Sequence, residues 1–356
     1  MPSSLDRAQA VVALGGGHGL HASLRALRHL VDDVVVDDLT AIVTVADNGG
    51  SSGRLRGEFG VLPPGDLRMA LAALCGEDEW GRTWEGVLQH RFAGDGDMNG
   101  HVVGNLLIVA LWEQLGDHVA ALDIVGRLLG AKGRVLPMAL CPMDIHADVR
   151  GLDPEDPDAL QVVQGQVEVA TTEGVITGVR LEPPAPPTSP DALAALAAAD
   201  WVFLGPGSWF SSVIPHLLVP DLRDALARTS ARAVVVLNLA EQPGETGGFS
   251  PADHLAVLLE HAPGLAVHTV LADRRTVETA GSEAAWHLEE TVTAAGARLV
   301  LADVAAADGS TRHDPRRLAD AYEQVMAGAD LGAGVGPDVG PGAGADPGPG
   351  GPAEGR

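Results

Sequence analysis

Short apolar runs alternate along the chain with amphipathic stretches of helical period. Residues 10–14 form the first run, glycines follow, and leucines three or four positions apart continue to Leu30. The same order of apolar run, polar turn and amphipathic stretch returns between residues 190 and 326. Strands that alternate with helices are typical of a mostly parallel sheet covered on both faces. The pattern therefore predicts an α/β fold.

The pattern also predicts where individual elements lie. Strands are expected at 10–14, within 34–45, and at 201–204, 233–237, 265–271 and 298–301. Helices are expected at 20–30, 67–74, 106–115, 117–129, 190–198, 221–228, 250–261, 282–295 and 315–326. Asp66 and Asp117 precede two of these helices and are expected to cap them. Residues 80–100 are polar and predict irregular structure.

The pattern of apolar and polar positions changes between residues 133 and 181. Residues 167–170 and 175–181 alternate between apolar and polar positions on either side of Glu173-Gly174, which predicts a β-hairpin. We therefore predict one α/β domain over residues 1–330, with a small antiparallel β insertion at about 134–182. Residues 331–356 are mostly Gly, Pro and Ala with almost nothing to bury, which predicts a disordered tail.

Composition narrows the class of protein. The 356 residues carry a formal net charge of −25, which disfavours a nucleic-acid partner. Two cysteines provide no disulfide framework, and residues 1–9 show no signal-peptide pattern. No apolar run approaches the ~18–20 residues of a membrane span. We expect a cytoplasmic protein that does not insert into a membrane.

The stretch 44–56 follows an apolar run and cannot be core. Its residues 47–56 comprise an acid, an amide, three glycines, two serines, two arginines and a single leucine. Glycines let backbone N–H groups turn inward, hydroxyls add donors, and arginines suit phosphate. We predict an anion-binding loop at the carboxyl end of a strand, with a solvated Gly/Ser turn as the alternative. Its candidate ligand-binding residues are Asp47, Asn48, Gly49, Gly50, Ser51, Ser52 and Arg54.

Other polar or glycine-rich segments follow strands in the same way. One glycine loop precedes the first helix, where backbone amides can approach a diphosphate. Taken singly, each segment is equally consistent with an ordinary strand-to-helix turn; taken together, they predict one cleft at the edge of the sheet. The candidates are Gly16, Gly17, His18 and Gly19, then Gly205, Gly207 and Ser208, and then Asn238, Gln242 and Glu245. His101 and Asn105, before another helix, are ligand contacts or structural hydrogen bonders.

Known catalytic patterns are missing from the sequence. There is no G-x-S-x-G, no H-E-x-x-H, no cysteine pair at zinc spacing and no Walker lysine. Asp47, Asp66 and Glu245 are candidates for Mg²⁺ binding or acid–base chemistry. Such residues more often cap helices or orient arginines, and Asp66 is well explained as a cap.

With these residues in place, the chain resembles the YvcK family of gluconeogenesis factors within the wider CofD-like group. The shared motifs run in order along the ordered chain, at residues 15–20, 44–56, 63–68, 91–92, 100–106, 133–137, 205–208, 214–215, 238, 242–246, 253–254 and 312–314. The resemblance implies a Rossmann-like three-layer α/β/α fold and binding of a UDP-sugar, chiefly UDP-N-acetylglucosamine. It also implies a role in carbon metabolism, peptidoglycan synthesis and cell shape.

Two functions from different classes follow from the resemblance. The first is a nucleotide-sugar-binding regulator that needs no cofactor, forms a homo-oligomer and acts on a cell-wall synthesis protein. In it the glycine loops hold the diphosphate, and Arg54, Arg56 or Arg312 offsets its charge. The second is a CofD-type transferase that moves a phospholactyl group to a deazaflavin, with Mg²⁺ at Asp47 and Asp66. A nicotinamide-dependent redox enzyme is disfavoured, because Leu20 replaces the third fingerprint glycine.

Overall fold

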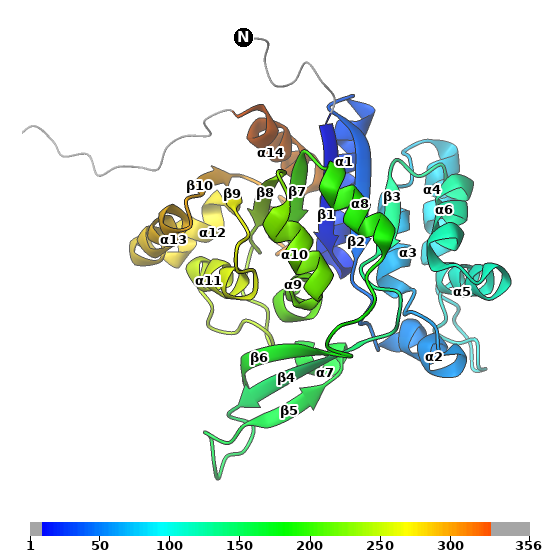
Figure 1. Ribbon diagram of the computed structural model, residues 1–356, viewed down its shortest axis with the longest axis horizontal. Coiled ribbons are helices and arrows are strands. Elements are labelled where there is room, and N and C mark those ends of the chain that lie inside the picture. Colours follow the sequence, from blue (N-terminus) through cyan, green and yellow to red (C-terminus); the bar gives the residue numbers. More distant parts are fainter. Residues whose placement is uncertain (1–8, 329–356) are drawn as a thin grey trace, which may run out of the picture.

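Seven parallel strands form the central sheet of the computed structural model, which describes residues 9–328 (Figure 1). Their order in the sheet is β10-β9-β8-β7-β1-β2-β3. The predicted strands are confirmed, and the sequence prediction missed the short edge strand β3. The bounds are β1 (Gln9–Gly15), β2 (Val36–Val43), β3 (Arg134–Pro137), β7 (Trp201–Leu204), β8 (Arg232–Val236), β9 (Val267–Asp273) and β10 (Arg298–Ala302).

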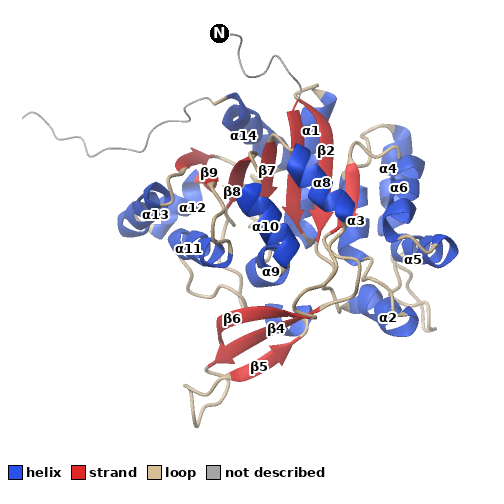
Figure 2. Cartoon of the chain, viewed as in Figure 1, coloured by secondary structure: helices blue, strands red, loops and turns tan. Residues whose placement is uncertain are grey.

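Helices cover both faces of the sheet, which confirms the predicted fold class (Figure 2). On one face α1 packs against α3 and α14, and on the other α8 and α10 pack together beside α9 and α11. The bounds are α1 (Gly17–Asp32), α3 (Gly65–Ala73), α8 (Pro190–Ala198), α9 (Ile214–Leu218), α10 (Pro220–Arg228), α11 (Pro251–His261), α12 (Arg274–Ala280), α13 (Ser282–Ala294) and α14 (Pro315–Ala327). A second group lies beyond α3: α2 (Gly50–Phe59), α4 (Glu79–Gln89), α5 (Val103–Leu115) and α6 (His118–Leu129).

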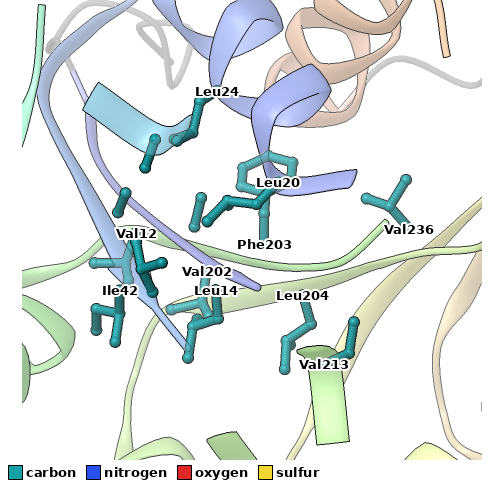
Figure 3. Packing of buried hydrophobic residues seen from close by; sticks show 14 of the residues in the cluster. Val12, Leu14, Leu20, Leu24, Ile42, Val202, Phe203, Leu204, Val213 and Val236 are labelled. Carbon is teal, nitrogen blue, oxygen red and sulfur yellow. The ribbon is translucent and has the colours of Figure 1, made fainter. Parts of the chain in front are cut away.

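The core extends on both faces of the sheet, and one part of it lies between the sheet and α1. Leu20 and Leu24 of α1 pack over Phe203 and the strand residues around it, and all are buried (Figure 3). Side chains of β1 and β7 are apolar on both faces, because helices cover both. Burying this much apolar surface fixes the strand ends, and with them the loops that follow.

The chain reverses its direction of travel across the sheet between β1 and β7. From the centre of the sheet, β1, β2 and β3 follow one another toward one edge, and β7, β8, β9 and β10 follow one another toward the other edge. The loops after β1 and β7 therefore leave on opposite faces and open a crevice between them. Open α/β sheets bind their ligands at this switch point.

A three-stranded antiparallel sheet projects from the carboxyl edge of the main sheet (Figure 1). It consists of β4 (Asp144–Arg150), β5 (Gln161–Gln164) and β6 (Val175–Glu182), with the short helix α7 (Gln166–Ala170) beside it. The predicted β character is confirmed, but the predicted hairpin is wrong, because residues 167–170 form α7. Five residues with period two cannot distinguish a strand from one helical turn that contacts its neighbours.

Several local predictions are corrected. Residues 80–100 are not irregular throughout, because α4 covers 79–89 with an Asp78 N-cap. The stretch 44–56 is a loop only to Gly49, since Gly50 begins α2. Asp66 does not cap α3; Pro64 holds the N-cap position and Asp66 lies in the first turn. The sequence analysis also missed α9, α12 and the π-helical turn η1 (Trp209–Val213) that precedes α9.

Two further predictions concern the C-terminal tail and insertion into a membrane. The predicted disordered tail, 331–356, lies outside the described residues. None of the helices in residues 9–328 combines the length and apolar character needed to cross a bilayer.

Candidate functional site

A cleft of about 570 Å³ opens beside the switch point. Four segments far apart in the sequence form its walls: the start of α1, the loop after β7, the loop after β8, and the segment that joins β10 to α14. The loops after β1, β7 and β8 therefore meet in one cleft as predicted, but the 44–56 stretch after β2, which was predicted to join them, does not line it. The lining residues are His18, Gly19, His21, Ala22, Arg25, Pro206, Gly207, Asn238, Leu239, Ala240, Glu241, Gln242, Ala306, Thr311, Arg312, His313, Asp314 and Pro315.

Gly19 allows the first two walls to meet. A Cβ on Gly19 would lie 2.2 Å from the carbonyl oxygen of Pro206 and 2.4 Å from Cα of Gly207. Gly205, with φ of 78°, turns the chain sharply at the end of β7. These glycines bring two backbones into contact, which leaves backbone groups rather than side chains at the base of the cleft.

Amide side chains join the loops after β7 and β8. Asn238 accepts a hydrogen bond from Gly207 N at 3.0 Å and donates one to Gly207 O at 2.8 Å. Gln242 accepts from Trp209 N at 3.3 Å and donates to the Ser208 hydroxyl at 3.3 Å. Asn238 and Gln242 therefore fix this wall of the cleft while they line it.

The segment between β10 and α14 covers the cleft as a short hairpin. Ala305 pairs with His313 in an antiparallel bridge, and Asp314 caps α14. Burial lowers the pKa of His313 to about 4, so its ring is neutral near pH 7. Arg312 donates to the Asp308 carboxylate at 2.7 Å, in an ion pair between two exposed side chains.

Two half-buried carboxylates, Asp47 and Asp66, lie behind the glycine loop. A Cβ on Gly16 would lie 2.6 Å from Oδ2 of Asp66, and one on Gly65 would lie 2.8 Å from Oδ2 of Asp47. Burial, and then the negative charge of Asp47, raise the pKa of Asp66 to about 7. Burial also raises the pKa of Asp47. Both carboxylates accept backbone hydrogen bonds, from Gly49 N and Gly17 N respectively.

The two serines of the 44–56 stretch bind other parts of the protein. The Ser51 hydroxyl accepts from Val102 N and from Asn105 Nδ2, both at 3.2 Å, and it contacts His101 Nδ1 at 3.2 Å. The Ser52 hydroxyl accepts from Gly65 N at 2.9 Å. The Ser51 contacts join the start of α2 to the start of α5 in a buried polar cluster, outside the cleft.

Asn48 and Arg54 also hold the protein together. Asn48 donates to Glu168 at 2.7 Å and accepts from Val167 N at 3.0 Å, which ties the loop after β2 to α7. Arg54 donates to the carbonyl oxygens of Asp97 and Asn99. Neither side chain reaches the cleft walls.

Glu245 anchors the turn after β7. Its carboxylate accepts from Phe210 N at 2.9 Å and from the Ser211 hydroxyl. The side chain is buried, and burial raises its pKa. Glu245 therefore lies beneath the cleft wall rather than on it.

The structure thus divides the predicted site residues into two groups. Those in the cleft lining are His18, Gly19, Gly207, Asn238, Gln242 and Arg312, and those outside it are Gly16, Gly17, Asp47, Asn48, Gly49, Gly50, Ser51, Ser52, Arg54, Asp66, His101, Asn105, Gly205, Ser208 and Glu245. Sequence reasoning missed the α1 wall, His21, Ala22 and Arg25. Their spacing from His18 at i+3, i+4 and i+7 on an amphipathic helix was the signal available.

Comparison with known proteins gives consistent results. The family described as 2-phospho-L-lactate transferase CofD matches residues 11–308. A "Putative gluconeogenesis factor" from Mycobacterium tuberculosis is 53% identical over 323 residues, which cover 91% of this chain and 92% of that protein. A "Gluconeogenesis factor" from Listeria monocytogenes is 35% identical, with 87% and 94% covered. A crystal structure of a UPF0052 family member from Bacillus halodurans, 31% identical, superposes with a TM-score of 0.75 over 89% of this chain and 99% of that one.

Proposed function

Since the chain belongs to the CofD family, in the YvcK branch of gluconeogenesis factors, we propose that it binds a UDP-sugar, UDP-N-acetylglucosamine, as a regulatory ligand. The bound state would link carbon metabolism to peptidoglycan synthesis and cell shape, through a cell-wall synthesis protein as partner. The observation that carries the proposal is the cleft at the switch point between β1 and β7.

The walls of the cleft suit a nucleotide sugar. Gly19 and Gly207 bring backbone groups to its base, where the amino end of α1 favours negative charge. Asn238 and Gln242 offer amide groups of the kind that read a base or a sugar hydroxyl. A cleft of about 570 Å³ is within the usual range for small-molecule sites.

A regulatory role follows from how the walls are built. The segment 303–314 closes one side of the cleft and is held by the Ala305–His313 bridge and by Asp314 N to Val304 O. A ligand that contacts this segment and α1 together favours one arrangement of the two. The surface presented to a partner would then depend on whether the ligand is bound.

A CofD-type transferase is the second candidate, and the carboxylate pair favours it. Mg²⁺ is commonly held by one or two carboxylates together with substrate phosphates. Asp47 and Asp66 fit this requirement, because two half-buried acids with raised pKa values are stabilised as anions by a cation. When bound, the ion would polarise a phosphoryl oxygen, and the two aspartates would hold it beside the glycine loop.

Isothermal titration calorimetry with UDP-N-acetylglucosamine tests the first proposal. We expect saturable binding with micromolar affinity, weaker binding of UDP-glucose, and no requirement for Mg²⁺. Absence of heat at millimolar ligand would exclude the proposed ligand.

Incubation with a deazaflavin acceptor and an activated phospholactyl donor in Mg²⁺ tests the second proposal. Mass spectrometry would detect the transferred product. If product forms and disappears in Asp66→Asn, the transferase is favoured over the regulator.

A further inference from the structure

Arg25 lies on the α1 wall of the cleft and has no partner among the residues that the structure describes. Its guanidinium makes no hydrogen bond or ion pair with any other residue among 9–328, and its Nε is buried. Arg28, three residues later, donates to the carbonyl of Cys75 and to Glu77, the latter at 2.7 Å. The chain has 48 acidic and 23 basic residues, so a half-buried arginine without an acid is unexpected.

The acids that line the same cleft are engaged elsewhere. Asp314 accepts from the backbone amides of Arg316 and Arg317 as the cap of α14. Glu241 accepts from Gly248 N. No carboxylate of the lining therefore neutralises Arg25, and its charge remains directed to whatever enters the cleft.

The other predicted cations are already matched. Arg312 pairs with Asp308, Arg56 pairs with Asp144 at 2.9 Å, and Arg54 donates to two backbone carbonyls outside the cleft. Arg25 is thus the arginine of the cleft lining that has no counter-charge within residues 9–328.

The position of Arg25 on α1 determines which part of the cleft its side chain can contact. Arg25 follows Gly19 by six residues, which is about 9 Å along a helix axis. Long side chains on helices lean toward the amino end, and Arg25 and Gly19 line the same cleft. The planar fork of donors on an arginine matches phosphoryl oxygens.

We propose that Arg25 binds a phosphoryl group of the ligand and supplies the positive charge assigned to Arg54, Arg56 or Arg312 from the sequence. This inference rests on the proposed function for its choice of ligand, a nucleotide diphosphate. Through Arg25, the α1 wall of the cleft discriminates phosphorylated ligands from their uncharged counterparts.

The test compares UDP, uridine and inorganic pyrophosphate by calorimetry on the full-length protein. In Arg25→Gln we expect UDP and pyrophosphate to bind about 10- to 100-fold more weakly, with uridine binding unchanged. Arg25→Lys should recover part of the loss, because it keeps the charge without the fork. Arg228→Gln, an exposed change on α10, is the matched control and should leave all affinities unaltered.

The outcomes separate this inference from the proposed function. Equal weakening of uridine and UDP in Arg25→Gln would show a structural role and overturn the inference, as would unchanged UDP binding. If the wild-type protein does not bind UDP-N-acetylglucosamine but binds pyrophosphate in an Arg25-dependent way, the subsite stands and the proposed ligand falls. If it binds none of these probes at millimolar concentration, both fall. Thermal unfolding of each variant confirms that it is folded.

Discussion

The loops after β1 and β2 look alike in sequence and differ in the folded protein. Each follows a buried strand, is rich in glycine and leads into a helix. After β1, Gly19 brings two backbones together at the base of an open cleft. After β2, the side chains of Asn48, Ser51 and Ser52 bind neighbouring segments of the protein.

The comparison shows that a polar loop can either bind a ligand or form hydrogen bonds that stabilise the fold. The loop after β1 has few hydrogen-bonding side chains, so its backbone stays available. The loop after β2 has many, and buried polar groups are paired wherever partners are in reach. Four substitutions test this difference between the two loops.

Gly19→Ala is expected to have the largest effect, because its Cβ would overlap Pro206 O. The two walls must separate, which we expect to destabilise the protein by about 2–4 kcal/mol. Binding of UDP-N-acetylglucosamine should fall at least 100-fold. Urea unfolding and calorimetry measure the two effects.

Gly57→Ala is the matched control, since its Cβ would meet no atom within 4 Å on α2. It should raise the free energy of unfolding by up to ~1 kcal/mol. A Gly19→Ala protein that is as stable as this control and binds UDP-N-acetylglucosamine as tightly would contradict the close contact between Gly19 and Pro206.

Asp66→Asn tests the carboxylate pair through pH. The pKa of Asp66 is raised from 3.8 to about 7, so the folded state favours the protonated acid. Its contribution to stability is full below about pH 4 and is lost as the pH rises through 7, by at most about 4 kcal/mol. Relative to wild type, Asp66→Asn should therefore become progressively more stable between pH 4 and pH 8 in urea unfolding. Parallel curves would contradict the raised pKa.

Ser51→Ala removes the hydroxyl that accepts from Val102 N and Asn105 Nδ2. Two buried donors lose a partner, and we expect a loss of about 1–3 kcal/mol in the free energy of unfolding. Affinity for UDP-N-acetylglucosamine in the folded protein should not change. A selective loss of affinity without loss of stability would return Ser51 to the ligand site.

Asn48→Ala should have the smallest effect, about 1 kcal/mol, because its hydrogen bonds to Glu168 and Val167 are exposed. Amide hydrogen exchange should accelerate in residues 165–170, while the cleft segments 18–25 and 205–208 keep their protection. Faster exchange throughout the cleft would show that α7 supports the ligand site as well.

Much of the fold was predictable, because burial on both faces of a parallel sheet leaves a strong apolar signal. Residues 201–204 and 233–237 were identified as strands from that signal alone. Residues 167–170 were not identified correctly, because four residues carry too little periodicity. Asp66 was read as a cap before a helix that starts at Leu67, whereas the helix begins at Gly65 and leaves the Asp66 side chain half-buried near Asp47.

The sequence by itself determined the alternation of strands and helices, the glycine-rich strand ends and the family to which the chain belongs. All of these depend on residues close together in the chain. Only the tertiary structure decided which polar side chains face the cleft, because Ser51 meets Asn105 and Asn48 meets Glu168 across 54 and 120 positions of sequence. It also revealed Arg25, since its lack of a partner among residues 9–328 depends on every described segment folded around it.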